Sequence, residues 1–278
     1  MRRQVHPGGV CTWHFDLDGP GVLAAVTTRH GGASTGPYRG LNLAYHVGDD
    51  PDRVAGNRRL LCRALGVATV TVPDQQHGCR VAVVDGDLAG AGYRSDDDAR
   101  ARLPATDALV TDQPGVALGV LMADCGPVVL FDPGRPALAV VHSGRRGAVL
   151  DVVGAAVRTL QDRFGTDPAD LRAGVGPCIG PASYEIGGDA LADTADALGD
   201  RFLAPSRPGH AHFDLPGALR WRLLQAGVPD RQVEMAAVDT YRSTADLFSD
   251  RAARPCGRIM LLAALRRGVR PADDPPAG

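Results

Sequence analysis

The sequence predicts an α+β fold, because it contains both segments typical of buried strands and segments typical of amphipathic helices. The centre of the chain is its most regular part. Residues 115–122, 128–132 and 137–141 are apolar and rich in valine and leucine, as strands buried on both faces are. Apolar residues at helical spacing mark residues 51–65 before this centre and residues 144–164 after it.

The first part of the chain is predicted to form strands and loops around one helix. Asp50 suits the N-cap, Pro51 suits the first helical position and Gly66 follows the last turn, so the helix spans residues 51–65. The other expected elements are strands at residues 22–28, 67–72 and 80–85, a Gly-rich loop at residues 29–36, and a mobile polar loop at residues 86–104 that contains Asp96-Asp97-Asp98.

The second part of the chain alternates between apolar segments and helical patterns. The chain has 278 residues, of which 44% are hydrophobic, and no linker forces a domain boundary. We therefore expect one domain over residues 1–270 and a disordered tail at residues 271–278. The expected elements are a strand at residues 171–175, helices at residues 188–203 and 214–226, and strands or buried segments at residues 233–238 and 259–265.

Composition excludes several classes of function. The formal net charge is −2 and no basic stripe is present, so we expect no nucleic-acid partner. No apolar run reaches the roughly 18 residues of a membrane span and no signal peptide is recognisable, which predicts a cytoplasmic protein without membrane contact. All 30 basic residues are arginine, so Schiff-base chemistry and a lysine base are excluded. Catalysis must use aspartate, histidine, cysteine, arginine or a metal.

Three residues of metal-ligand type lie at predicted strand ends and turns. The turn signal at residues 133–136 joins two of the central strands, and a meander of all three would bring Cys125 and His142 to one sheet edge. Strand spacings near 4.8 Å would then put these two residues about 10 Å apart or less. With His77 they offer one thiolate and two imidazoles, which leaves an open position on a catalytic zinc ion. Copper would suit the same ligands.

Other polar residues have two readings that the sequence leaves open. Arg146, at the start of the helix after His142, suits an anion such as phosphate. Asp124 could act as a base or accept a ribose hydroxyl, or it could cap the end of a strand. Arg29 could contact an anion, or it could be an ordinary polar residue of its loop. Glu185 is one of only two glutamates in the chain, which singles it out as a candidate contact.

These residues stand in stretches that resemble the YfiH-type laccase-domain family, also called multicopper polyphenol oxidase-like. The stretches cover most of the chain in the family's order, and together they are far more specific than any one of them. They are Thr28-Arg29-His30-Gly31-Gly32, Gly36-Pro37-Tyr38, Leu41-Asn42-Leu43, His46-Val47-Gly48-Asp49-Asp50, Asn57-Arg58-Arg59, Gln76-His77-Gly78, Ala123-Asp124-Cys125, His142-Ser143-Gly144, Gly176-Pro177, Ile179-Gly180-Pro181 and Tyr184-Glu185-Ile186-Gly187.

The resemblance implies a layered α/β/β/α domain with a zinc site at a sheet edge, held by His77, Cys125 and His142. It implies a purine nucleoside phosphorylase that converts adenosine, inosine or methylthioadenosine and phosphate into the free base and the sugar 1-phosphate. Adenosine deamination is the implied side activity. With Arg146 on the anion, Asp124 and Asn42 would contact substrate hydroxyls.

Departures from the family pattern leave other readings open. Arg145 stands where the family usually has tryptophan, Asp239 stands where it has cysteine, and residues 250–253 replace its Arg-Arg-Asp-Gly. One alternative is an amidase of a specialised pathway, either with Cys125 as the nucleophile or dependent on the metal. A copper oxidase is a second, although only one His-x-His pair exists for a three-type copper site. A catalytically inactive metal-binding module is a third.

Overall fold

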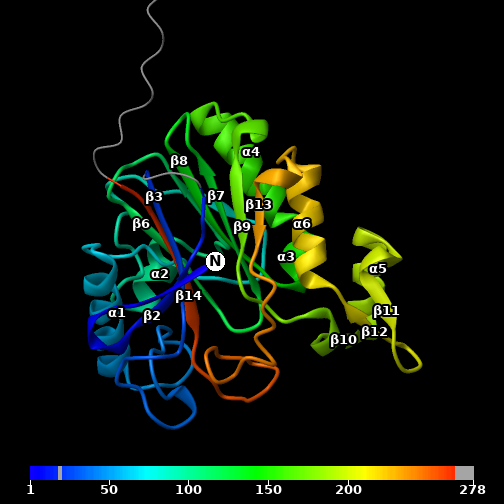
Figure 1. Cartoon of the computed structure of the whole chain (residues 1–278), viewed down its shortest axis with the longest axis horizontal. Coiled ribbons are helices and arrows are strands. Elements are labelled where there is room, and N and C mark those ends of the chain that lie inside the picture. Colours follow the sequence, from blue (N-terminus) through cyan, green and yellow to red (C-terminus); the bar gives the residue numbers. More distant parts are fainter. Residues whose placement is uncertain (18–20, 267–278) are drawn as a thin grey trace, which may run out of the picture.

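Two β-sheets packed face to face form the centre of the computed structural model, which describes residues 1–17 and 21–266 (Figure 1). The first sheet contains, in spatial order, β1 (Arg2–Val5), β2 (Cys11–His14), β3 (Val22–Thr27), β14 (Ile259–Leu265) and β6 (Ala117–Met122). The second contains β13 (Val233–Met235), β9 (Arg172–Val175), β7 (Gly126–Asp132), β8 (Ala137–Ser143), β5 (Ala108–Thr111) and β4 (Val81–Val83). A third, small sheet contains β10 (Glu185–Gly187), β12 (His210–Phe213) and β11 (Leu203–Pro205).

Helices cover the outer face of each large sheet and so produce four layers. Figure 1 shows α1 on one side of the paired sheets and α3, α4 and α6 on the other. The expected α/β/β/α arrangement is thereby confirmed, because one apolar cluster lies between the sheets and one lies under each helical layer. The helices are α1 (Pro51–Leu65), α2 (Asp96–Arg102), α3 (Arg145–Val149), α4 (Val152–Phe164), α5 (Asp189–Leu198) and α6 (Leu215–Gln225).

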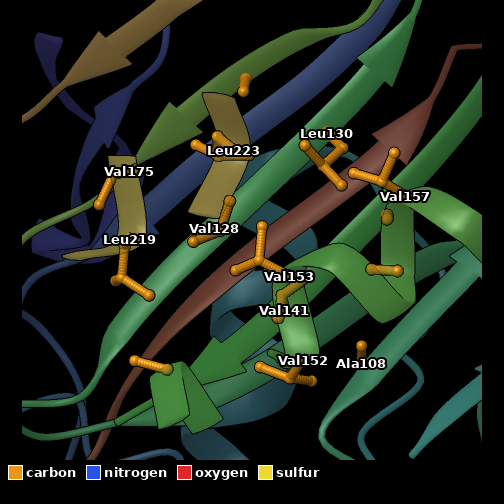
Figure 2. Close-up of a cluster of buried hydrophobic side chains, with 14 of the residues drawn as sticks. Ala108, Val128, Leu130, Val141, Val152, Val153, Val157, Val175, Leu219 and Leu223 are labelled. Atoms are coloured by element: carbon orange, nitrogen blue, oxygen red, sulfur yellow. The ribbon is translucent and has the colours of Figure 1, made fainter. Parts of the chain in front are cut away.

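The central strands are apolar throughout because both of their faces are buried. On β7, Val128 and Leu130 face the helical layer, whereas Val129 and Phe131 face the opposite sheet. Figure 2 shows the first pair packed among valines of α4 and leucines of α6. Burying a side chain of this size contributes about 1.5–3 kcal/mol, so a charge on either face would be severely destabilising.

Helix α1 confirms the capping signals. The Asp50 side chain accepts a hydrogen bond from the Asp52 N–H, and Pro51 is the first helical residue. Gly66 ends the helix with φ 71°, a left-handed conformation that glycine adopts without the steric cost of a Cβ.

Three expectations about the elements were wrong. Residues 115–122 do not form a meander with the next two strands, because β6 pairs with β14 in the opposite sheet. Residues 67–72 contain only an isolated bridge at Thr71, since that segment passes along β6 without a ladder. The helix expected over residues 144–164 is two helices, because Asp151 adopts φ 59° and N-caps α4 through the Gly154 N–H.

The polar segment at residues 86–104 is also more regular than expected. It contains α2, whose N-cap Ser95 accepts the Asp98 N–H. The three aspartates form the first turn, where the helix dipole favours negative charge. The predicted tail at residues 271–278 lies outside the described residues. Among the described residues, no helix is long and apolar enough to cross a membrane.

Candidate functional site

His77, Cys125 and His142 lie together, as predicted for a metal site. Each offers one ligand atom, and these three atoms lie within 4.8 Å of one another. The Cys125 Sγ is 3.7 Å from the His77 Nε2. The rings of His77 and His142 meet edge to face, with their centroids 4.9 Å apart. Three segments far apart in the sequence therefore present one thiol and two imidazoles to a common point.

The β7–β8 hairpin alone brings Cys125 close to His142. Gly126 pairs with Ser143 and Pro127 pairs with His142, so Cys125 directly precedes the strand end where His142 lies. The convergence was expected from a three-strand meander, but the first strand of that meander belongs to the other sheet. The tight turn predicted at residues 133–136 does join β7 to β8, and this hairpin is enough to bring Cys125 close to His142.

Asp107, which was not predicted, holds His77 and His142, two of the three candidate ligands, in place. Its buried carboxylate accepts a hydrogen bond from the His142 ring at 2.8 Å. The same carboxylate accepts the backbone N–H groups of Gln76, His77 and Gly78 at 3.2, 3.0 and 2.7 Å. A carboxylate behind a ligating imidazole fixes its ring orientation and leaves the other ring nitrogen free for a metal. Asp107 immediately precedes the short strand β5, which was also not predicted.

Gly144 lets the backbone pass close to the candidate ligands. A Cβ at this position would lie 2.6 Å from the Cys125 Sγ and 3.6 Å from the His77 ring. A contact of 2.6 Å is too short for these atoms, so any larger residue would push the thiol out of place. The glycine of His-Ser-Gly is thus required by packing at the site itself.

Charges within the group favour a thiolate. Burial alone would raise the pKa of the Cys125 thiol, but the charge of His142 and hydrogen bonds from both imidazoles lower it to about 6. Burial opposes the charging of His142, yet the Cys125 thiolate and Asp107 raise its pKa to about 9. Without a metal, the protein stabilises a thiolate–imidazolium pair at neutral pH. A divalent cation would replace the imidazolium proton as the partner of the thiolate.

The donor set fits zinc or copper in its chemistry. A thiolate and two imidazoles are ligands that both ions accept, and three protein ligands leave one position open for a reactant. Asp107 supplies the second-sphere hydrogen bond that ligating histidines usually make. These observations make His77, Cys125 and His142 the candidate ligands.

The candidate ligands line a cavity of about 610 Å³, a volume in the range of small-molecule sites. Five arginines and two aspartates line it, so its wall is positively charged. They are Arg145, Arg146, Arg251, Arg254, Arg258, Asp124 and Asp250. Among the described residues, Arg146 is exposed and its side chain makes no hydrogen bond or ion pair. Its guanidinium is therefore free to bind an anion.

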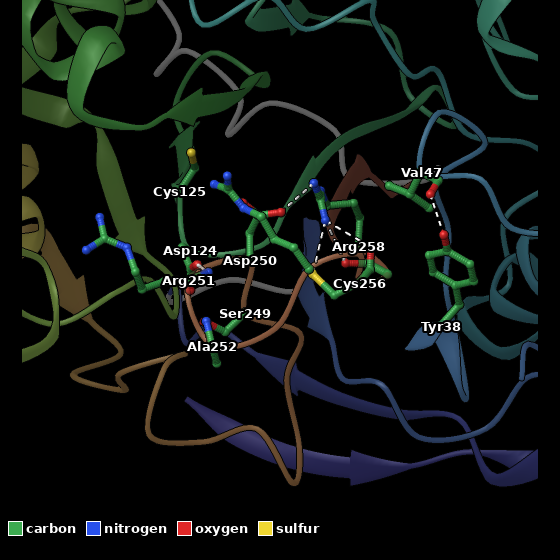
Figure 3. Close-up of polar contacts among 12 residues, drawn as sticks. Tyr38, Val47, Asp124, Cys125, Ser249, Asp250, Arg251, Ala252, Cys256 and Arg258 are labelled. Carbon is green, nitrogen blue, oxygen red and sulfur yellow. Dashed lines mark hydrogen bonds and ion pairs between the residues drawn. The ribbon is translucent and has the colours of Figure 1, made fainter. Parts of the chain in front are cut away.

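Both aspartates of the cavity wall are occupied by contacts within the protein. The Asp124 carboxylate accepts the Thr240 hydroxyl at 2.6 Å and the Arg251 N–H at 2.7 Å. Asp250 pairs with Arg254 and, at 3.2 Å, with Arg258, as Figure 3 shows for the second pair. Asp124 thus lines the cavity, and its carboxylate ties its own segment to those of Thr240 and Arg251.

Three residues expected to bind substrate do not line the cavity. Asn42 is completely buried, and its side chain is bonded to Ala44, Asp49 and the Arg258 N–H. The Glu185 carboxylate faces solvent, where it binds Ser206 and Arg207. The Arg29 guanidinium lies over the Phe248 ring and bonds the Thr244 carbonyl. All three side chains make contacts within the protein, so the expectation that they bind substrate in this cavity is not confirmed.

Two of the three departures from the family pattern, Arg145 and Asp239, take different positions. The Arg145 guanidinium turns to α5, where it bonds the Ala190 carbonyl and the Thr194 hydroxyl. It thereby links α3 to α5. Asp239 lies away from this cavity and accepts the Ser183 hydroxyl at 2.6 Å.

Neither Tyr184 nor the loop of residues 249–258 was among the predicted site residues, although residues 250–253 were noted as a departure from the family pattern. The loop contributes four cavity residues, and the Arg251 guanidinium lies 5.2 Å from the centre of the Tyr184 ring. Burial raises the pKa of the Tyr184 phenol to about 12, so it remains a neutral hydrogen-bond donor. The recurrence of arginine in Arg251, Arg254 and Arg258 was the available sequence signal.

Comparisons with known proteins agree with this architecture. A purine nucleoside phosphorylase from Streptomyces coelicolor is 40% identical over 241 residues, which cover 86% of this chain and 93% of that protein. The crystal structure of YlmD from Geobacillus stearothermophilus superposes with a TM-score of 0.89 at 31% identity, covering 95% of this chain and 99% of that one. YfiH from Bacillus licheniformis superposes with a TM-score of 0.85 at 31% identity, covering 91% and 99% of the two chains.

The family model described as multi-copper polyphenol oxidoreductase laccase matches residues 23–266, which is nearly the whole described chain. The match includes all three candidate ligands and every arginine of the cavity wall. The chain therefore belongs to the multi-copper polyphenol oxidoreductase laccase family.

Proposed function

We propose that this protein is a zinc-dependent purine nucleoside phosphorylase that cleaves adenosine, inosine or methylthioadenosine with phosphate and deaminates adenosine as a side reaction. The observation that carries the proposal is the His77–Cys125–His142 group in the wall of an arginine-rich cavity. Relatives with 32–40% identity that are named purine nucleoside phosphorylase support the choice of reaction.

The charged cavity wall suits the phosphate of this reaction. In phosphorolysis a phosphate oxygen bonds to the ribose C1′ while the bond from C1′ to the purine nitrogen breaks. Arg146 and Arg251 line the cavity on two different segments, so an anion between them could be bound from two sides. Guanidinium groups bind phosphate oxygens in a bidentate manner, which would hold the attacking oxygen in one orientation.

The other groups at and behind the cavity wall have roles that follow from their positions. A bound zinc ion would supply a Lewis acid next to the substrate. Asp107 would keep the His142 ring in its ligating orientation. The neutral Tyr184 phenol can donate a hydrogen bond to a sugar or base oxygen, and its ring offers an apolar surface. Because five arginines line the cavity against two aspartates, its wall keeps a net positive charge for the phosphate.

The direct test is product formation from a panel of nucleosides, with and without phosphate, on protein whose metal content has been measured. We expect free base and ribose 1-phosphate only when phosphate is present, and about one zinc per chain by elemental analysis. Copper in place of zinc, with oxidation of a phenol and no nucleoside cleavage, would favour an oxidase. Bound metal without turnover of any substrate would favour a metal-binding module.

Replacing Arg146 with alanine should weaken phosphate binding far more than metal binding. Loss of a charge-assisted hydrogen bond of about 1.5–3 kcal/mol should raise the KM for phosphate by about 10–100-fold. Arg158→Ala is the matched control, because Arg158 is an exposed arginine on α4 whose partner is Asp151. Steady-state kinetics at varied phosphate would decide the matter, and an unchanged KM in Arg146→Ala would remove this residue from the phosphate site.

A second candidate function has one observation in its favour. The lowered pKa of the Cys125 thiol next to two imidazoles is the arrangement of a cysteine nucleophile with a histidine base. A cysteine-dependent amidase would use the same three residues without metal. The two functions differ in what chelation does to turnover.

A further inference from the structure

A fourth histidine, His46, lines the same cavity and does not belong to the candidate ligand group. It lies on the loop between β3 and α1, whereas the candidate ligands come from other segments of the fold. Its Nδ1 is 3.7 Å from a carboxylate oxygen of Asp96, the first residue of α2. Among the described residues, the Nε2 of this ring makes no hydrogen bond or ion pair, so it is free to bind a molecule in the cavity that His46 lines.

Buried contacts hold this histidine and its aspartate in their positions. The Arg58 guanidinium, which is 1% exposed, donates to the Leu43 carbonyl and to the Gly92 carbonyl. It therefore joins the segment that leads to His46 with the segment that leads to Asp96. The Arg58 guanidinium also stacks on the Tyr45 ring, with 4.5 Å between the group and the ring centre.

A second anchor fixes the other end of the loop. The Tyr38 hydroxyl donates to the carbonyl of Val47 at 2.6 Å (Figure 3). His46 is thus flanked by one anchored residue on each side. The backbone that carries His46 is therefore fixed at the cavity wall, and its half-exposed side chain has the Asp96 carboxylate as its charged partner.

We propose that His46, oriented by Asp96, is the acid that protonates the purine as the glycosidic bond breaks. The proposal rests on the proposed phosphorylase function and names the residue that activates its leaving group. The bond between C1′ and the purine N9 breaks with its electron pair moving onto the base, and His46 Nε2–H gives a proton to N7. The attacking HPO₄²⁻ gives up its own proton as its oxygen bonds to C1′, and that proton restores the imidazolium through solvent.

The other titratable groups of the described cavity wall do not suit this step. The Asp124 and Asp250 carboxylates are engaged in hydrogen bonds and ion pairs. The Tyr184 phenol is a weak acid because burial raises its pKa to about 12. Arginine does not give up its proton in proteins. Outside the candidate ligand group, His46 is the described wall residue whose side chain can both donate and accept a proton and is not tied up in hydrogen bonds.

The test compares two substrates in His46→Gln. Inosine needs a proton at N7, whereas 7-methylinosine already has a positively charged base that leaves without one. We expect kcat/KM for inosine to fall by about 10²-fold, within the usual range for removal of a general acid. We expect kcat/KM for 7-methylinosine to stay close to that of the unaltered protein. An equal loss on both substrates in a variant with unchanged melting temperature and zinc content, or no loss on either, would overturn the proposal.

Two further variants complete the experiment. His30→Gln is the matched control, because His30 is a half-exposed histidine paired with Asp246 at 2.6 Å and does not line the cavity. This variant should have the same kcat/KM as the unaltered protein for both substrates. Asp96→Asn keeps His46 but removes its charged partner, so it should lower the ratio of inosine to 7-methylinosine turnover in the same direction.

The ratio also protects the test against a folding defect. A variant that is partly unfolded loses activity on both substrates equally, whereas loss of the acid changes their ratio, and the melting temperature and zinc content would confirm intact protein. If the unaltered protein cleaves neither substrate with phosphate, the phosphorylase proposal itself fails. If the unaltered protein cleaves both and His46→Gln leaves the ratio unchanged, only the role of His46 fails.

Discussion

Replacing Cys125 with serine is expected to remove the metal and nucleoside phosphorolysis together. Serine is too weak a zinc ligand to take the place of a thiolate, so the remaining two imidazoles should bind the ion poorly. If the ion supplies several kcal/mol of transition-state stabilisation, kcat/KM should fall by about 10³-fold or more. Zinc content and phosphorolysis measured on the same preparation would check this. Chelation should have the same effect on the unaltered protein, and added zinc should reverse it.

Two results would separate this mechanism from a cysteine nucleophile. Cys79→Ser is the control, since Cys79 is an exposed free cysteine and should be dispensable. On chelated protein, an electrophilic substrate analogue would form a stoichiometric adduct at Cys125 if the thiolate is the nucleophile. Full amidase turnover by the chelated protein, with that adduct found by mass spectrometry, would contradict the metal-centred proposal.

The sequence predicted the fold best where a local pattern of residues is compatible with a single structure. The caps of α1 determine its ends, and the turn between β7 and β8 determines their pairing, so both were predicted correctly. The assignment of residues 115–122 failed because a strand buried on both faces is equally apolar in either sheet. Its partner β14 lies about 140 residues further along the chain, and nothing local indicates that pairing.

The same distinction explains which site residues could be predicted. Cys125 and His142 follow from a local hairpin, and His77 follows from a turn of polar residues. Asp107 could not be recognised, because its role comes from contacts with residues about 30 positions before and after it. Asn42 and Glu185 have residue types suited to substrate, but burial and the direction of the side chain decide their roles, and sequence gives neither.

Asp107→Asn is expected to impair the metal site more than its conservative chemistry suggests. The substituted amide would have a single side-chain oxygen, which cannot accept the His142 ring together with three backbone N–H groups. Removal of such a partner behind a ligating histidine typically lowers metal affinity by about 10–100-fold. We expect a loss in this range for Asp107→Asn. Asp107→Ala, which leaves all four donors without their acceptor, should also lower the free energy of unfolding by about 2–4 kcal/mol.

Asp132→Asn distinguishes a metal-site effect from a general loss of stability. Asp132 is also buried, at 1% exposure, and its carboxylate accepts the Gly134 and Arg135 N–H groups at the opposite end of β7. Both asparagine variants should lower the melting temperature, but only Asp107→Asn should weaken zinc binding in a competition titration with a chromophoric chelator. If the two variants lose zinc affinity equally, Asp107 acts through fold stability alone. If Asp107→Asn binds zinc as tightly as the unaltered protein, His142 does not depend on its carboxylate for its orientation as a ligand.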